Sequence, residues 1–450
     1  MSQPRTDDFT FVATGDSILT RRILTYEDAN PSFRRMVDLI RSADASFTNL
    51  EVLVHDFEGY PAATSGGTYM RAPPYVLDEL TGMGFDLFSA ATNHSFDYSH
   101  GGLEATIDHL DARDIAYAGI GRTLFEAREP AYVETPGGRV GLVSASTSYP
   151  AGSQAGEQTP ALGGRPGLNP IKTSTVYTLD DHLLENLREI ADATGIERIK
   201  QNWFDRGILY GHDWTQEEFY HFGDMKFQEA DGGAGVVYDP DGAHVDAFCA
   251  SITDAARNAD WTVASIHTHQ GKDGMDTTPE TPDFMRQLGE RAIDAGADIV
   301  VCHGPHVLRG LDVYEGKPIF HSLGNFIVQN ETVSRLPHES FVRYDLEEFT
   351  RVSDVFEERL YDESGAPKGD LTNTRFWRTV LPTCTFSSDG TVDIQLHPIT
   401  LHPDAGRPQR GIPCLASGSI ATDILEEFEA LCSDFGTTIE IDGERASLSI

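Results

Sequence analysis

Two histidines set three residues apart, His303 and His306, have the types and spacing that could hold a metal ion. They follow a β-branched run at residues 299–301, which predicts a buried strand, and Gly304 and Pro305 end that strand in a loop. Open α/β sheets bind ligands at the carboxyl ends of their strands, and imidazole is a good ligand for Zn, Mn and Fe. A pair of hydrogen-bonded loop histidines is the alternative that this stretch alone leaves open.

Four further predicted strand ends carry side chains of the same kind. Any one of them alone is more typical of a turn than of a metal site, but each follows a separate strand: Asp16; Asn49 and Glu51; Asn93, His94 and Asp97; His267 and His269. Mixed imidazole, carboxylate and amide ligands suit Mn, Fe, Zn or Ni better than Mg alone. Two such ions close together can share a hydroxide and clamp a phosphate-like group. The sequence therefore predicts a site for one or two divalent transition metal ions.

Strands and helices alternate along most of the chain before residue 330, which would bring these polar strand ends together. Hydrophobic spacing predicts strands at 9–14, 45–48, 85–91, 115–118, 140–146, 261–266, 299–301 and 318–322, and helices at 31–42, 73–83, 101–113, 245–259 and 281–295. This alternation is typical of an α/β fold with a parallel-rich sheet wrapped by helices. All the candidate ligands would then lie at one edge of that sheet.

Two stretches fall outside this alternation. Residues 151–245 read as an insertion, with a stripe of Leu and Ile that predicts a helix over 176–194. The insertion is either a lid that supplies substrate contacts or a subdomain with no part in the site. We expect residues 8–345 to form the main domain and residues 346–450 a C-terminal extension that packs on the core. Within the extension we predict strands at 379–386 and 392–396, a helix at 419–431 and a hairpin at 439–450.

The composition is strongly acidic, with 71 Asp and Glu against 34 Lys and Arg and a formal net charge of −37. The excess acid is dispersed along the chain, and lysine is scarce. This pattern indicates a protein adapted to high salt, where self-repulsion is screened. Nucleic acid is excluded as a partner, because phosphate binding needs a basic face.

Cysteine usage and hydropathy bear on the compartment. The five cysteines lie far apart with no paired spacing, which favours free thiols in a reducing compartment. The first residues lack the apolar segment of a signal peptide, and no run reaches the length of a transmembrane helix. We therefore expect a cytoplasmic protein without membrane insertion.

The chain resembles the bacterial capsule synthesis protein CapA family in the order of its motifs: Gly15-Asp16, Asn49-Leu50-Glu51, Asn93-His94 with Asp97, His267-Thr268-His269, His303-Gly304-Pro305-His306 and Ser322-Leu323-Gly324-Asn325-Phe326. That family is similar in fold to the calcineurin-like metallophosphoesterases. The resemblance covers about residues 9–328.

The resemblance implies a fold and a set of ligands. The fold is an α/β four-layer α/β/β/α sandwich of metallophosphatase type, with the inserted segment and the C-terminal extension added to it. The metal ligands implied by analogy are Asp16, Asn93, His267 or His269, and His306, with Glu51 in the place of a bridging aspartate. The strand-end pattern adds His303 and the other histidine of the 267/269 pair as candidate ligands. Ile18 stands where the phosphoesterases usually carry a histidine, which predicts a weak or vacant first metal position.

Other residues near the ligands receive non-ligand roles. His94 would stabilise the leaving group, steered by Asp97, because neighbouring side chains on an extended loop point apart and Asn93 can then face the metal. The alternative is that His94 and Asp97 only cap the following helix. We also expect Asn49 and Asn325 to contact the substrate.

Two functions of different classes follow. The first is a metal-dependent hydrolase of phosphoester or amide bonds, acting on a small-molecule or poly-glutamate-type substrate. The second is an accessory component of poly-γ-glutamate (capsule) biosynthesis or export without hydrolytic activity. The complete set of strand-end ligands favours the enzyme, and neither the substrate nor the oligomeric state follows from the sequence.

Overall fold

A large mixed sheet forms one half of the computed structural model, which describes residues 8–207, 214, 218–230, 232–347 and 351–450. Four of its strands are parallel and lie side by side: β1 (Phe9–Ile18), β2 (Ala45–Leu50), β5 (Leu87–Ser89) and β6 (Ala116–Ala118). Helices connect them in the predicted order: α1 (Pro31–Ser42), α2 (Tyr75–Met83) and α3 (Ser99–Asp111). β19 (Asn325–Val328) pairs in parallel with the carboxyl end of β1.

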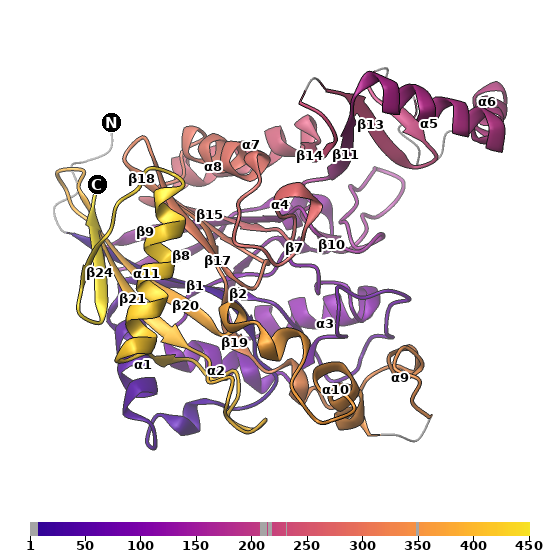
Figure 1. The fold of residues 1–450 in the computed structure, drawn as a ribbon. Helices are drawn as coiled ribbons and strands as arrows, with labels where there is room; N and C mark the ends of the chain where they lie inside the picture. Colours follow the sequence, from indigo (N-terminus) through magenta and orange to yellow (C-terminus); the bar gives the residue numbers. More distant parts are fainter. Residues whose placement is uncertain (1–7, 208–213, 215–217, 231, 348–350) are drawn as a thin grey trace.

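A second sheet forms the other half, so the fold has two central sheets rather than the one that the alternation alone suggests (Figure 1). Its parallel strands are β9 (Gly138–Ser146), β15 (Trp261–His267), β16 (Ile299–His303) and β18 (Lys317–Leu323). Antiparallel strands complete it at the two edges: β8 (Ala131–Thr135) and β17 (Leu308–Tyr314). Helices α7 (Gly242–Asn258) and α8 (Asp283–Asp294) pack on this sheet.

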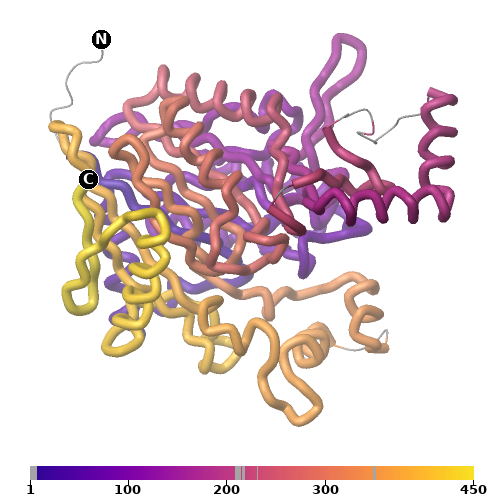
Figure 2. The backbone as a smooth tube through the Cα atoms, turned by 45° about the horizontal axis from the view of Figure 1, so that its top comes forward, coloured from indigo at the N-terminus to yellow at the C-terminus, as the bar shows by residue number. Residues whose placement is uncertain are grey.

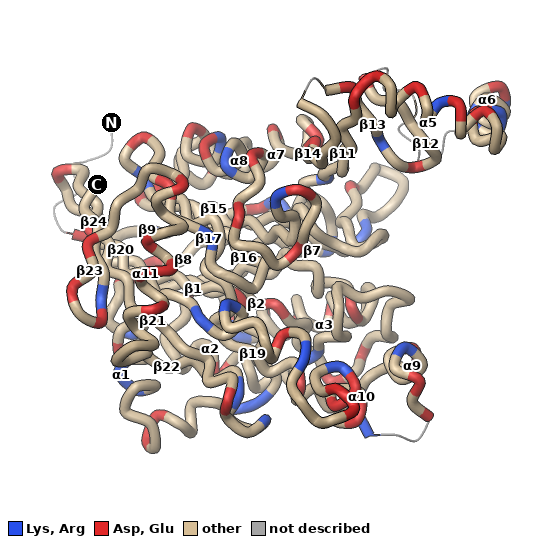
Figure 3. The backbone as a smooth tube through the Cα atoms, in the orientation of Figure 1, with Lys and Arg blue, Asp and Glu red and all other residues tan. Residues whose placement is uncertain are grey.

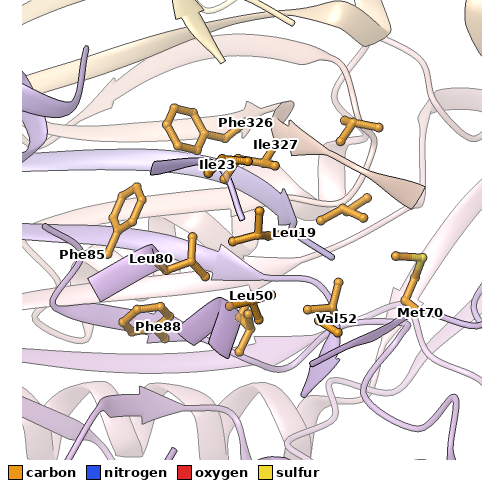
Figure 4. Packing of buried hydrophobic residues seen from close by; sticks show 14 of the residues in the cluster. Leu19, Ile23, Leu50, Val52, Met70, Leu80, Phe85, Phe88, Phe326 and Ile327 are labelled. Carbon is orange, nitrogen blue, oxygen red and sulfur yellow. The ribbon is translucent and has the colours of Figure 1, made fainter. Parts of the chain in front are cut away.

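Buried apolar side chains hold these parts together in three clusters. One lies between the sheets, where Phe11 and Phe47 pack with Val263, Val301 and Phe320. A second joins the large sheet to α1, α2 and α3, and Figure 4 shows part of it. The third joins the second sheet to α7 and α8. Each fully buried side chain of this size contributes about 1.5–3 kcal/mol, so the clusters fix how the strand ends of the two sheets face each other.

A close backbone approach positions the end of β1. Asp16 N–H donates to the Gly324 carbonyl at 2.9 Å, and the register of β1 shifts between Asp16 and Ser17. A Cβ on Gly15 would lie 1.9 Å from the Gly324 oxygen, so only glycine fits there. This contact brings β1 against the loop that follows β18.

The inserted segment builds a small sheet of its own from β11 (Thr173–Leu179), β12 (Tyr220–Phe222), β13 (Met225–Glu229) and β14 (Gly235–Pro240), with helices α5 (Asp181–Thr194) and α6 (Ile196–Asp205). It projects from the main body in Figures 1 and 2. The predicted helix over 176–194 is wrong at its start, because residues 173–179 pair with β13 and β14 and the helix begins only after the N-cap Asp180. Residues 208–213, 215–217 and 231 lie outside the described residues.

The C-terminal segment extends the large sheet. β20 (Arg378–Phe386) pairs antiparallel with β1, and β21 (Val392–Thr400) follows it. The other elements here are α9 (His338–Val342), α10 (Val352–Leu360), β22 (Cys414–Leu415), α11 (Ser419–Ser433), β23 (Glu440–Asp442) and β24 (Arg445–Ser449). Residues 348–350 and the N-terminal residues 1–7 lie outside the described residues.

Short elements fill the connections: β3 (Leu53–Val54), β4 (Arg71–Ala72), β7 (Ile120–Gly121), α4 (Leu124–Arg128) and β10 (Gly167–Leu168).

All five cysteines are free thiols. Within the described residues, each helix is either too short or too polar to cross a bilayer. Acidic residues are spread over every part of the fold in Figure 3.

Candidate metal centre

Three fully buried ligand-type side chains meet where the two sheets face each other. His267 and His303 are register partners at the ends of β15 and β16, and Asp16 reaches them from β1. The two Nδ1 atoms lie 2.9 Å apart, and Asp16 Oδ1 lies 4.0 Å from His267 Nδ1 and 3.7 Å from His303 Nδ1. These atoms could bind one common ion. We call Asp16, His267 and His303 the inner triad.

A second set of ligands lies beside the first, nearer to solvent. It consists of Glu51, which follows β2, and of His269 and His306, which lie beyond β15 and β16. His306 Nδ1 lies 3.9 Å from Glu51 Oε2 and 3.4 Å from Asp16 Oδ2, so the two sets adjoin. Both Glu51 oxygens and His269 Nε2 are buried without a hydrogen-bond partner among the described residues. We call this group the outer triad.

The hydrogen bonds of the inner histidines favour lone pairs on the facing nitrogens. His267 Nε2 lies 3.0 Å from Asn93 Oδ1, which can only accept, so the ring proton is on Nε2 and Nδ1 carries a lone pair. His303 Nε2 lies 2.7 Å from Ser265 Oγ. When His303 donates to this hydroxyl, two lone pairs face each other at 2.9 Å, and a cation between them relieves their repulsion.

The electrostatics of the cluster also suit a cation. Burial lowers the pKa of His303 to about 4 and holds the pKa of His267 well below its usual range. Burial and the neighbouring Asp16 raise the pKa of Glu51 well above its usual range. Burial opposes the charged form of Asp16 too, but the hydrogen bond to His306 and the positive charge of that imidazole lower its pKa overall. The two inner imidazoles are therefore neutral at pH 7 and available as ligands.

Two amides hold ligands in place. Asn49 Nδ2 donates to Asp16 Oδ1 at 2.8 Å, and Asn325 Oδ1 lies 2.9 Å from His306 Nδ1. Both side chains are fully buried. This favours a positioning role over the substrate contact that we expected for them.

Backbone conformation also fixes His306. This residue has a φ of +61°, in the left-handed region. Gly304 before it has a φ of +113°, and a Cβ there would lie 2.6 Å from the Thr268 carbonyl oxygen. The glycine thus permits the turn that aims His306 back at Asp16.

His94 and Asp97 form a separate pair beside the ligands. His94 Nδ1 lies 2.6 Å from Asp97 Oδ2, and Asp97 also accepts from the backbone N–H groups of Gly66 and Met70 at 3.2 and 2.7 Å. The capping alternative is wrong, because α3 begins at the N-cap Tyr98 without a side-chain cap hydrogen bond, and the side chains of His94 and Asp97 bond to each other and to the loop at 66–70 instead.

A cavity of about 190 Å³ opens over the site. His94, Asn93, His269 and His306 line it. Ile18, which stands where the phosphoesterases usually carry a histidine, also lines it. The remaining lining residues were not predicted from the sequence: Gly66, Gly67, Thr68, Met70, Asp276, Thr277, Asn330, Arg359, Asp370 and Phe376. Most of them come from connecting segments, where only a charge such as that of Arg359 could have drawn attention. The described part of the 151–245 insertion supplies none of them, and its role as a lid stays a prediction.

The structure thus brings the predicted site residues from five separate strand ends into one place. Fold and site are those of an α/β protein with a candidate metal centre at the carboxyl ends of its strands. The family described as "Bacterial capsule synthesis protein PGA_cap" matches residues 10–330, and the chain belongs to this family, which lies within the metallophosphoesterase-like superfamily.

Similar proteins have been named in several bacteria. "Uncharacterized protein y4sH" of Sinorhizobium fredii is 31% identical over 443 residues, covering 97% of this chain and 92% of the relative. "Capsule biosynthesis protein CapA" of Bacillus anthracis is 24% identical over 368 residues, or 80% of this chain and 69% of the relative. "PGA biosynthesis protein CapA" of Bacillus subtilis is 40% identical over 99 residues, or 22% and 24%.

Proposed function

We propose that this protein is a metal-dependent hydrolase of the metallophosphoesterase type that cleaves a phosphoester or amide bond. One observation carries the proposal: two adjoining ligand triads lie beside a cavity that His269, His306 and the oriented imidazole of His94 line. A ligand set alone could be structural, whereas an oriented imidazole beside it has a role in proton transfer.

The residues fit one or two divalent transition metal ions such as Mn, Fe or Zn. Asp16, His267 and His303 would hold one ion, and Glu51, His269 and His306 a second. The unpartnered oxygens of Glu51 support this, because a buried carboxylate without a partner is costly unless a cation or a proton satisfies it. When bound, the metal supplies Lewis acidity and a nucleophilic hydroxide at neutral pH.

The chain's own residues would perform the proton transfer and the orientation. Asp97 accepts two backbone N–H groups and is therefore fixed, and it holds His94 through Nδ1. The opposite nitrogen, Nε2, would donate its proton to the leaving group as the bond breaks. Asn93 is adjacent in sequence but engages His267, so the two neighbours serve different partners.

The proposed class also implies a particular arrangement of layers and domains. We propose that the two sheets with their outer helices are the four-layer α/β/β/α sandwich of metallophosphatases, spanning residues 8–345. In this proposal residues 151–245 are an insertion, and residues 346–450 are an extension that supplies Arg359 and Phe376 to the cavity wall. We also propose a cytoplasmic, salt-adapted protein, which the free thiols and the acidic composition support.

A second candidate is an accessory role in poly-γ-glutamate assembly without hydrolysis. The names of the two Bacillus relatives favour it. The two candidates differ in one measurable property, which is metal-dependent turnover.

The His94→Ala variant tests the hydrolase. It should keep the metal content of the wild type, while turnover of an activated phosphoester falls by roughly 10²–10⁴-fold, as expected for a lost general acid. His109→Ala is a matched control, because this histidine lies on α3 outside the described cavity lining. Full turnover in His94→Ala would refute its role, and metal-loaded wild type without any turnover would favour the accessory function.

A further inference from the structure

A second cavity adjoins the one over the metal centre. It has a volume of about 260 Å³ and shares Gly67, Thr68 and Arg359 with the metal-site cavity. Of its other lining residues, Ser340 lies in α9, and Val355 and Phe356 lie in α10. Arg343 and Tyr344 follow α9, and Leu336 precedes it. Whole small-molecule ligands usually occupy roughly 300–1,000 Å³, so this space suits one functional group of a larger molecule.

The lining of this second cavity is cationic, against the trend of the whole chain. Acidic residues outnumber basic ones by 71 to 34 in the sequence. The described residues that line the cavity nevertheless include two arginines, Arg343 and Arg359, and neither Asp nor Glu. Ser340 and Tyr344 add hydroxyl groups, and Phe356 adds an apolar wall.

One guanidinium is held in place and the other is available. Arg359 donates to Thr68 Oγ1 at 2.7 Å and pairs with Asp370 at 3.2 Å, which fixes its side chain at the junction of the two cavities. Arg343 is exposed and forms no ion pair with the part of the chain that the structure describes. A planar guanidinium without a carboxylate partner binds carboxylate or phosphate oxygens in a bidentate manner.

We propose that Arg343 and Arg359 form a subsite for an anionic group of the substrate, a carboxylate or a phosphate, while the bond to be cleaved lies at the metal centre. This assignment rests on the proposed hydrolase function. It limits the substrates to molecules that carry a negative charge away from the reacting bond.

Direct binding tests the subsite without any turnover. Metal-free full-length protein is titrated calorimetrically at fixed ionic strength with glutarate, with inorganic phosphate and with the neutral analogue glutaramide. At least one anion should bind, glutaramide should not, and Arg343→Gln should weaken anion binding by roughly 10-fold or more, as expected for a charge-assisted pair. Preference for glutarate would assign a carboxylate, and preference for phosphate a phosphate.

A matched control is available in Arg257→Gln. Arg257 is also exposed and lies at the end of a helix, but it is absent from the cavity lining. This variant removes the same charge and should bind the anion like the wild type. Equal weakening in both variants, or equal binding by wild type and Arg343→Gln, would overturn the subsite.

Turnover provides a second and separate readout. With metal bound, Arg343→Gln should lower kcat/KM for an ester that carries a distal carboxylate or phosphate at least 10-fold more than for its neutral analogue. An unchanged ratio would refute the subsite while leaving the hydrolase intact. A chain that turns over neither ester would refute the hydrolase, and the calorimetric comparison would still decide the subsite.

Discussion

The inner and outer triads contain similar side chains but occupy different environments. The inner ligands Asp16, His267 and His303 are fully buried at the ends of β1, β15 and β16. In the outer triad, Glu51, His269 and His306 lie on loops beyond strand ends, and the two histidines are only partly buried. The inner set is therefore enclosed by the sheets, whereas two ligands of the outer set, His269 and His306, reach the cavity. This difference predicts a tightly held ion beside a more labile one that meets the substrate.

The largest effect is expected from His303→Ala in the inner triad. This change removes an inner ligand and leaves Asp16 and His267 without their shared partner. Metal affinity should fall by more than the roughly 10–100-fold that changes around a ligand cost, and turnover should be lost with it. Elemental analysis of the folded variant checks the metal content. A His303→Ala protein with the metal content of the wild type would show that the inner triad is structural.

His269→Ala in the outer triad should have a smaller effect. The inner ligands remain, so the variant should retain one tightly bound ion and lose the weaker one. Titration with Mn or Zn into metal-free protein should show one binding step in place of two. Loss of both ions in His269→Ala would contradict the distinction between the two triads.

The pH dependence of the metal-free chain should separate the triads again. Burial lowers the pKa of His303 from 6.5 to about 4, so its contribution to stability is present above pH 6.5 and is lost as the pH falls toward 4. Burial also opposes the charge of His306, but Glu51 and Asp16 raise its pKa to about 10. Its contribution is present below pH 6.5 and is lost as the pH rises toward 10.

Each of these contributions is on the order of a few kcal/mol. Denaturant unfolding of the metal-free chain should show that stability falls toward pH 4, which is the acid limb, and also toward pH 10, which is the alkaline limb. His303→Gln should reduce the acid limb without removing it, because His267, His55 and His397 also have lowered pKa values. His306→Gln should reduce the alkaline limb alone. The assignment fails if either variant removes the limb of the other.

Added salt is expected to have the smallest effect on the two triads, although it should stabilise the protein as a whole. Acidic residues are spread over all parts of the fold, where KCl screens their repulsion, whereas a largely buried cluster is screened little. The Tm should rise between dilute buffer and molar KCl, and by the same amount in wild type, His303→Ala and His269→Ala. A Tm that stays flat or falls would refute the salt adaptation, and unequal rises would mean that a triad is open to salt.

The positions of the strand ends could be predicted because the local hydrophobic spacing and helix caps favour the same elements that the folded protein contains. Residues 31–42 form the predicted helix without a shift, since Pro31 at its start, the N-cap Asn30 and the spacing of Phe33, Met36, Val37 and Ile40 all favour it. The strands before Asp16, Asn49 and His303 were found from their buried β-branched and aromatic residues. The candidate ligands could then be predicted, because the carboxyl ends of parallel strands lie at the same edge of a sheet.

The parts that the sequence did not predict depend on distant partners. Residues 173–179 form a strand because β13 and β14 pair with them, although the following Leu and Ile stripe suggested one continuous helix. β17 was missed because its neighbour β18 supplies its hydrogen bonds. Arg359 reaches the cavity through tertiary contacts such as its bond to Thr68, and no local pattern predicts a pair separated by 291 positions.

The antiparallel pairing of β20 with β1 has a consequence for the order of assembly. The family match ends at residue 330, yet Phe9 to Val12 pair with residues 383–386. During synthesis the strand that carries Asp16 therefore keeps an open edge until the ribosome has passed residue 386. An open apolar edge recruits other chains, so a polypeptide shortened to the matched region should aggregate. In the folded protein the last quarter of the chain covers this edge of β1.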